Sequence, residues 1–487
     1  MLLFAFTVNE TAVMITRTPT TIKIFVLRFI WVLYTLEGGG GYRGTVPHNL
    51  RRDLGTIESY AALLGILIGA GIFKVTSEAW VLTGPSVILG YLVLAPAILA
   101  TSVAYSVFLS TPLGREPGGE YTHVSRTFGG YGLAFVGSWL KIISYIGALA
   151  YLARAMGDYA RQLFGGRGSV DAIAVGSLIF FFVIHVAGVR WFGRLQVWMC
   201  VVLGISLMVL IFPGLFAVQT ANYRPFFTHG ARGFIAALPP LFFAYAGFEA
   251  LAQTAGEVRD SIRRLPAIFV RGIVATMIIY LLMSVVALGV LPQAQLGKVS
   301  APMAEAASRY LPFSAAAVVT IGALMAIATS LNATMLVPSR VAIMLADDRV
   351  APRWIGRVSE RTGTPIVGLT ITLAAALILL LSGQISLALN IAVFALVILY
   401  LLHSVALLLL PRLNPELFAQ VTVRIPLWLQ RAMAILSIVA MAAILTQLTL
   451  PTVQLLAFWA GVGALLYASG RIAHRRTAGG VEHAEEP

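Results

Sequence analysis

The residues of this chain that could do chemistry stand inside apolar runs. The stretch ILIGAGIF, residues 66–73, places Gly69 and Gly71 in the middle of a long apolar segment, with only Ala70 between them. Glycine in a helix interior costs about 1 kcal/mol relative to alanine, so the pair predicts an unwound stretch. Unwound backbone frees N–H groups, which suit a carboxylate, and carbonyl groups, which suit an ammonium group or a cation. Close packing of helices through small residues is the competing interpretation.

A second apolar segment has the same features and adds a charge. The stretch LPPLFFAYAGFEALAQTAGEVRD, residues 238–260, has two prolines early, Ala246 and Gly247 at its centre, and Glu249 at depth. An ionised carboxylate in the hydrocarbon region is costly, so such residues pair, protonate or face water. Glu249 is therefore either a structural ion-pair member or a functional group. The functional alternatives are a proton-linked gate and a counter-charge for a cationic substrate.

Composition identifies the elements that must position these residues. Of the 487 residues 59% are hydrophobic and 11% are charged, whereas about 25% are charged in a typical soluble domain. The mean hydropathy is +0.88, so we expect an all-α integral membrane protein in a lipid bilayer. The formal charge of +14 falls in short loops and does not predict nucleic-acid binding. A single cysteine, Cys200, excludes an intrachain disulfide.

Twelve apolar runs are long enough to be membrane-spanning helices. They cover residues 56–82, 85–110, 131–156, 170–188, 195–218, 233–256, 267–291, 313–345, 365–382, 386–410, 430–449 and 451–470. The two interrupted segments are the first and the sixth of these runs. Interrupted helices at matching positions of two halves are typical of an inverted repeat with a ligand site at the bilayer midplane.

This pattern predicts the organisation of the chain. We expect a first five-helix repeat over residues 48–219, a second over 220–410, two accessory helices over 411–470 and a tail over 471–487. Most arginines fall in loops on the side of Arg51 and Arg52, which predicts that this side and both ends of the bundle are cytoplasmic. Residues 1–47 fit this scheme poorly. They are an interfacial helix, a further span, or the product of a start codon assigned too far upstream.

Four stretches of the sequence resemble the amino acid–polyamine–organocation family of permeases. They are LLGILIGAGIFKVTSEAWVLTGPSVIL (63–89), EPGGEYTHVSRTFGGYGLAFVGSW (116–139), FFAYAGFEALAQTAGEVRD (242–260) and TSLNATMLVPSRVAIMLADDRVAP (329–352). The resemblance implies a five-plus-five inverted repeat with discontinuous first and sixth helices. It implies transport of an amino acid or amine across the cell membrane by alternating access, coupled to H⁺ or Na⁺, without a cofactor.

Other functions stay open to different degrees. An exchanger without ion coupling, and a non-transporting sensor or partner on the same fold, are the alternatives to ion-coupled transport. The sequence leaves monomer and homodimer undecided. An enzyme is not expected, because the seven histidines are scattered with no HxxxH or HExxH spacing that would hold a metal.

The resemblance also implies a site. The substrate carboxylate would lie on N–H groups of Gly69, Ala70 and Gly71, and its ammonium group would meet carbonyls of one residue of the first span and three of the sixth. These four residues are Ile68, Phe243, Ala244 and Ala246. Phe243 matches an aromatic residue that closes over the substrate, and Tyr245 lies nearby. Ordinary packing is the competing interpretation for both rings.

Lys74 and Glu78 depart from the family pattern. They are four residues apart, so they share one helix face and can pair. An ion pair facing the outer vestibule is one interpretation, and a part in gating or substrate selection is the other. Lys141 and Arg154 are charged residues in the third run, and the same two interpretations apply to them. For Arg154, a side chain long enough to carry its charge to the membrane interface is the simpler explanation.

The coupling ion is predicted less directly. Some members of the family carry a lysine in the fifth span that replaces a sodium ion, and the matching position here is Leu203. Hydroxyl oxygens of Thr329 and Ser330, with carbonyls near Ala62 and Gly65, would form a sodium site. Hydroxyls in membrane helices also bond to their own backbone, so both sodium and proton coupling stay open.

Overall fold

The computed structural model describes residues 52–69, 71–292 and 302–482. The predictions for residues 1–47 and for Ala70 therefore lie outside the described residues, as does the side chain of Lys74.

Ten helical segments of the described chain are long and apolar enough to cross a membrane. They are Thr56–Phe73, Thr76–Leu109, Gly132–Arg161, Val189–Phe216, Gly230–Gln253, Ser261–Val290, Ala317–Asp347, Ile385–Leu413, Leu427–Leu445 and Leu450–Ala468. Two shorter apolar helices, Val170–Val186 and Ile366–Leu381, coincide with the predicted fourth and ninth spans. The prediction of an all-α, multi-pass membrane protein is confirmed, while the total of twelve spans and the inverted repeat stay predictions.

The long helices carry most of the chain. They are α5 (Val87–Leu109), α7 (Gly132–Leu163), α8 (Val170–Val186), α9 (Val189–Phe216), α12 (Ser261–Val290), α14 (Phe313–Asp347), α15 (Ile366–Leu381), α16 (Ile385–Leu413), α18 (Leu427–Leu445) and α19 (Leu450–Glu482).

Short helical pieces connect them. They are η2 (Gly84–Ser86), η3 (Pro112–Arg115), α6 (Glu120–Phe128), η4 (Thr220–Tyr223), α13 (Pro302–Ser308), η7 (Arg353–Gly356) and α17 (Pro415–Ala419). A single parallel bridge joins Leu54 to Val258. Such extended contacts are brief because backbone groups in lipid are best satisfied within a helix.

The first predicted break is present. Helix α3 (Thr56–Leu67) stops at Ile68, whose φ of −79° and ψ of 43° are not helical. The chain resumes as a π-helix, η1 (Gly71–Val75), and continues as α4 (Thr76–Thr83). The interruption falls at the two glycines because they lower helix stability where the chain must open.

The second predicted break is present as well. Helix α10 (Gly230–Tyr245) ends at Ala246, which is extended with φ −77° and ψ 156°. Gly247 then takes a φ of +107°, a conformation that glycine adopts without the steric cost of a Cβ atom. The chain resumes as the short α11 (Ala250–Gln253) and η5 (Ala255–Glu257).

The two breaks lie against each other. A Cβ atom on Gly71 would come within 2.5 Å of the Cα atom of Ala244, and one on Gly247 would come within 2.9 Å of Ile66. The glycines therefore allow the backbones to approach directly. Helix α10 also packs on α4 and η1, so both interrupted segments form one unit.

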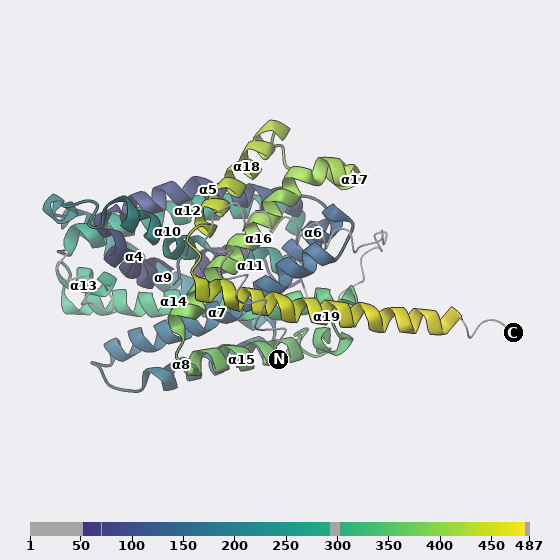
Figure 1. The fold of residues 1–487 in the computed structure, drawn as a ribbon. Helices are drawn as coiled ribbons and strands as arrows, with labels where there is room; N and C mark the ends of the chain where they lie inside the picture. The colour runs from purple at the N-terminus through teal and green to yellow at the C-terminus, as the bar shows by residue number, and fades with distance from the viewer. Residues whose placement is uncertain (1–51, 70, 293–301, 483–487) are drawn as a thin grey trace, which may run out of the picture.

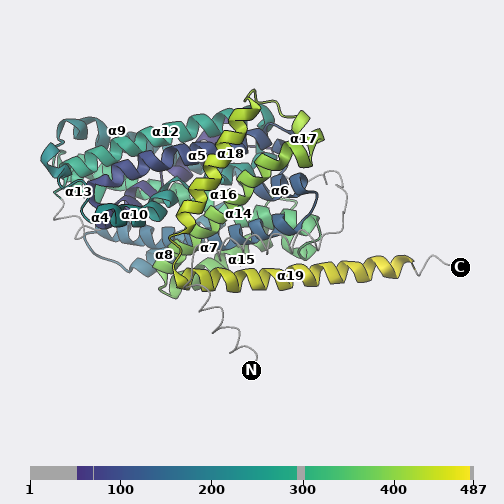
Figure 2. The ribbon, with the colours of Figure 1, turned by 45° about the horizontal axis from the view of Figure 1, so that its top comes forward.

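Long helices surround this unit. Helix α7 packs against α16, α14 and α8, and α14 packs against α9 and α3 (Figure 1). Helix α19 lies along the outside and runs past the end of the bundle (Figure 2). Only 17% of the apolar stretch in Leu450–Ala468 is buried, compared with 78% in Gly132–Arg161. The last helix is thus peripheral, and α7 is central.

Candidate functional site

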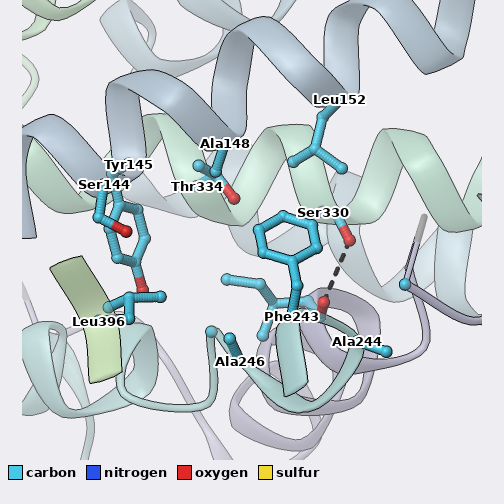
Figure 3. A pocket seen from close by; sticks show the side chains of 13 residues that line it. Ser144, Tyr145, Ala148, Leu152, Phe243, Ala244, Ala246, Ser330, Thr334 and Leu396 are labelled. Atoms are coloured by element: carbon cyan, nitrogen blue, oxygen red, sulfur yellow. Dashed lines mark hydrogen bonds between the residues drawn. The ribbon is translucent and has the colours of Figure 1, made fainter. Parts of the chain in front are cut away.

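A small cavity lies at the junction of the two breaks. Its volume is about 30 Å³, which is room for a few water molecules. Its walls come from α3, η1, α7, α10, α14 and α16 (Figure 3). The lining residues are Ile66, Gly71, Ser144, Tyr145, Ala148, Leu152, Phe243, Ala244, Ala246, Gly247, Ser330, Thr334 and Leu396. The cavity is compact, so this conformation is closed around the site.

The lining combines hydroxyl groups with aliphatic side chains. Ser144, Ser330 and Thr334 supply hydroxyls, while Leu152 and Leu396 supply aliphatic surface. Among the described residues that line the cavity, none is an acid or a base. Such a wall can accept an uncharged group, and backbone at the two breaks can meet the charged ends of a zwitterion.

Five residues predicted for the substrate site line the cavity: Gly71, Phe243, Ala244, Ala246 and Gly247. Ser330, predicted for the sodium site, lines it as well. Gly69 lies beside α14, where an added Cβ atom would overlap the hydroxyl of Ser330. Ile68 ends α3, and its N–H donates to the Leu64 carbonyl at 2.7 Å.

Tyr245 points elsewhere. Its ring lies 5.6 Å from that of Tyr91 and 4.9 Å from that of Tyr280, measured between centroids. Its hydroxyl lies 3.4 Å from the Tyr91 carbonyl. Tyr245 thus packs against α5 and α12 and is not among the residues that line the cavity.

Phe243 separates this cavity from a larger one. Its ring meets the ring of Tyr151 edge to face, with centroids 5.6 Å apart. Tyr151 also donates to Glu78 at 3.0 Å. A second cavity of about 420 Å³ is lined by Glu78, Tyr151, Arg154, Ala155, Asp158, Gly383 and Ile385. Because Phe243 lines the first space and Tyr151 the second, the ring pair stands between them.

The larger cavity is polar. Arg154 contacts Asp171 at 2.6 Å and Asp158 at 3.7 Å. The arginine therefore lies within an acidic group of side chains, and Glu78 faces the same space.

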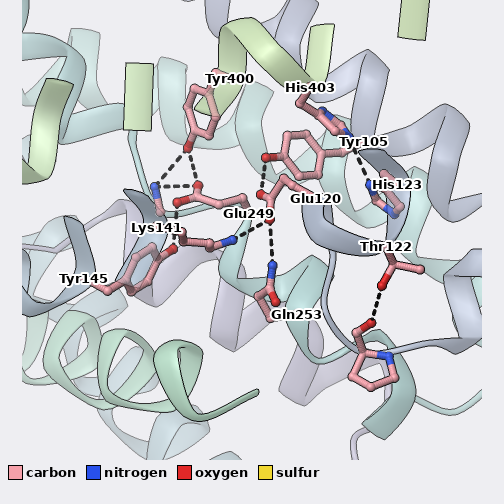
Figure 4. Close-up of polar contacts among 12 residues, drawn as sticks. Tyr105, Glu120, Thr122, His123, Lys141, Tyr145, Glu249, Gln253, Tyr400 and His403 are labelled. Atoms are coloured by element: carbon pink, nitrogen blue, oxygen red, sulfur yellow. Dashed lines mark hydrogen bonds and ion pairs between the residues drawn. The ribbon is translucent and has the colours of Figure 1, made fainter. Parts of the chain in front are cut away.

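Glu249 is fully buried and held by three donors. Tyr145 of α7 donates at 2.7 Å, the N–H of Gly247 donates at 2.9 Å, and Tyr400 of α16 also donates to this carboxylate (Figure 4). These bonds replace the water that a buried carboxylate loses. They also tie the chain just after the second break to two helices of the surrounding bundle.

A second buried carboxylate lies beside the first. Glu120 of α6 accepts from Lys141 at 2.7 Å and from Gln253 at 2.6 Å, and Tyr105 also donates to it. Lys141 lies 5.5 Å from the centroid of the Tyr145 ring. The side chains of Glu120 and Lys141 are each 1% exposed. One buried network thus joins the two carboxylates (Figure 4).

The sequence signals for this network are weak. Glu120 belongs to the EPGGEY stretch and Lys141 was noted as a buried charge, but no spacing rule pairs them. Tyr145 and Tyr400 carry no signal at all, because their partner Glu249 is far from both in the sequence.

The residues predicted to form a sodium site are close together. The Thr329 hydroxyl lies 2.8 Å from the Gly65 carbonyl, and the Ser330 hydroxyl lies 3.1 Å from the Ile66 carbonyl. Ala62, predicted to lie near a carbonyl ligand, is buried in α3. The carbonyl that contacts α9 belongs to the preceding residue, Ala61. Leu203 is buried in α9.

A multi-pass helical protein whose two interrupted helices meet around a small cavity has the construction of a secondary transporter. The sequence pattern that defines the amino acid permease family matches residues 54–466. The chain belongs to the amino acid permease family.

Individual relatives agree with this assignment. The methylthioribose transporter of Bacillus subtilis is 25% identical over 445 residues, which cover 86% of this chain and 93% of that protein. The branched-chain amino acid permease of Bacillus subtilis is 26% identical over 339 residues, covering 66% of this chain and 72% of that protein. Cationic amino acid transporter 1 of Arabidopsis thaliana is 27% identical over 345 residues, and the match spans 57% of that protein's length.

Proposed function

We propose that this chain is a secondary active transporter that carries amino acids across the cell membrane by alternating access, driven by a proton or sodium gradient. The observation that carries the proposal is the contact of the two broken helices, Gly71 against Ala244 and Gly247 against Ile66, beside a closed cavity. The names of relatives support it, since they describe permeases and transporters of amino acids.

The broken helices supply backbone groups for both charged ends of a zwitterion. The first N–H groups of a helix are unpaired within the helix, so the start of η1 at Gly71 suits the carboxylate. The carbonyls at the end of α10, near Ala244 and Ala246, suit the ammonium group. Gly69 completes the carboxylate side, and the Ile68 carbonyl completes the ammonium side.

The substrate class follows from the walls. The cavity is lined by aliphatic and hydroxyl side chains from α7, α14 and α16. Glu249 lies behind the lining residues Tyr145 and Gly247, and its carboxylate is already engaged by three hydrogen-bond donors. A cationic side chain would leave water with no charged partner among the described residues that line the cavity, which is costly. The preferred substrate is therefore an amino acid with an uncharged side chain.

Two barriers would control access. The Phe243–Tyr151 ring pair closes the side of the larger cavity. On the other side, Leu54 pairs with the backbone of Glu257 and Arg259, at 3.0 and 2.9 Å. The excess of arginine in the loops of this second side supports a cytoplasmic location for it and for both ends of the bundle.

Uptake into liposomes tests the proposal. The purified protein would be reconstituted and supplied with labelled alanine, leucine, glutamate, lysine and arginine under imposed proton or sodium gradients. Neutral substrates should enter at least about tenfold faster than lysine or arginine, since a loss of 1.4 kcal/mol corresponds to tenfold. Protein-free liposomes are the control. Neither accumulation nor exchange of any substrate would contradict transport, and preferred lysine uptake would contradict the substrate class.

A further inference from the structure

Three helices meet at the carbonyl groups that precede the first break. Helix α3 presents the Ala61 carbonyl from its middle, and the Gly65 and Ile66 carbonyls from its last turn, toward α9 and α14. Backbone carbonyls at an interrupted helix are the groups that coordinate a cation in transporters of this construction. What these oxygen atoms contact therefore bears on ion coupling.

Side-chain donors occupy these positions. The amide nitrogen of Gln196, a fully buried residue of α9, lies 3.3 Å from the Ala61 carbonyl and 3.2 Å from the Thr329 carbonyl. The Thr329 hydroxyl meets Gly65, and the Ser330 hydroxyl meets Ile66. One amide thus links α3 to α14 from a third helix.

The opposite end of the amide is fixed. The side-chain oxygen of Gln196 accepts from the Asn332 amide at 2.7 Å. The backbone carbonyl of Asn332 lies 2.8 Å from Nε2 of His185, in α8. Because the oxygen is engaged on the Asn332 side, the NH₂ group must face the carbonyls of α3 and α14.

The helices are close together at this point. A Cβ atom on Gly65 would lie 2.9 Å from Cβ of Thr329 and 3.0 Å from Sγ of Cys200, and it would overlap the Gln196 amide. A cation would need these carbonyl oxygen atoms as ligands. The Thr329 and Ser330 hydroxyls could turn and coordinate it too. The NH₂ group of Gln196, in contrast, is a donor only and would have to leave the Ala61 carbonyl.

We propose that the amide of Gln196 takes the part of a coupling cation in this transporter. It holds the carbonyls of α3 against α14 in the closed conformation, and transport is independent of sodium. The inference rests on the proposed function and narrows its ion coupling. Gln196 is a positioning residue: it contacts no substrate, and its bonds to Ala61 and Thr329 must break when α3 moves away from α14.

The first test is made on the unaltered protein. Initial uptake of a neutral amino acid should change less than twofold when sodium is replaced by choline at fixed pH and membrane potential. Sodium should also leave the melting temperature of the detergent-purified protein unchanged. A several-fold stimulation of uptake by sodium, or stabilisation that saturates with sodium, would overturn the proposal. The melting measurement tests sodium binding even if no substrate is transported. A failure of this proposal can therefore be distinguished from a failure of the proposed transport function.

Two substitutions test the role of the residue. Gln196→Leu removes both donor and acceptor, and uptake should fall at least tenfold in sodium and in choline alike. Gln196→Glu puts a carboxylate beside the same carbonyls, and its uptake should rise with sodium concentration. Gln430→Leu, at a buried glutamine of α18 that donates to Ile425, is the matched control and should transport normally. Normal, sodium-independent uptake by both Gln196 variants would overturn the proposal.

Discussion

Glu249 illustrates how a carboxylate is kept inside a membrane bundle. Its three donors come from α7, from α16 and from the backbone just after the second break. These bonds compensate for lost hydration. They also link the segment that follows the second break to the surrounding helices α7 and α16. Glu249 is thus placed to take part in the gating that the sequence predicts for it.

Glu249→Gln should lower the initial rate of uptake roughly tenfold, since bonds from donors to a charged group are worth about 1.5–3 kcal/mol. Glu305→Gln, whose side chain is 40% exposed, is the matched control. If Glu249→Gln keeps the uptake rate of the unaltered protein, the residue has no part in gating or coupling.

Lys141 compensates the second carboxylate. Lys141→Met should lower the free energy of unfolding by about 3–5 kcal/mol, because it leaves Glu120 buried without its cation. Thermal or denaturant unfolding of the detergent-purified protein measures this. The double variant Lys141→Met/Glu120→Gln should recover most of the loss. Equal stability of the single and double variants would show that the ion pair is not what stabilises this region.

At the scale of elements, the glycines at the breaks do two things. They let α3 and α10 stop inside the bundle, and they let the broken ends touch. Gly247 needs its positive φ, whereas Gly71 needs the space that a side chain would fill.

Gly71→Ala should therefore reduce uptake strongly, because the new Cβ atom would lie 2.5 Å from Cα of Ala244. Gly204→Ala is the matched control, since an added Cβ atom in that part of α9 meets nothing within 4 Å. The variants would be compared for uptake and for substrate affinity. Equal uptake by both would mean that the two breaks need not approach this closely for transport.

A buried ion pair lies at the contact between Leu54 and the backbone of Glu257 and Arg259. Arg340 of α14 contacts Glu257 at 3.1 Å, and both side chains are 1% exposed. Arg340→Gln should loosen this end of the bundle, so that amide hydrogen exchange in α3 becomes faster. Arg353→Gln, at an exposed position in η7, should leave exchange unchanged. If amide exchange in α3 is unaltered in Arg340→Gln, the ion pair does not help to close this end of the bundle.

At the scale of the whole molecule, charge asymmetry predicts orientation. The loop after α14 is rich in arginine, with Arg349, Arg353, Arg357 and Arg361, whereas the loop between α7 and α8 carries one positive residue, Arg167. Cytoplasmic loops carry the excess of positive charge.

Cysteines introduced at position 167 and at position 357 should report this orientation. A membrane-impermeant maleimide should label position 167 in intact cells, and position 357 only after permeabilisation. The natural Cys200 is largely buried and donates to Ala61 at 3.2 Å, so the unaltered protein serves as the background. The reverse labelling pattern would invert the proposed topology.

The sequence alone determined the helical membrane class, the family resemblance and the places where two helices break. These features depend on local properties: apolar length, the low helix stability of glycine, and the order of residues within short stretches.

The tertiary structure decided which side chains face the site. Tyr245 turns to α5, Tyr145 and Tyr400 reach Glu249, and Gln196 crosses to α3 and α14. Periodicity could not predict these contacts, because lipid-facing and interior faces of a membrane helix are both apolar. A polar side chain in such a helix finds its partner across the bundle, and only helix packing brings the two together.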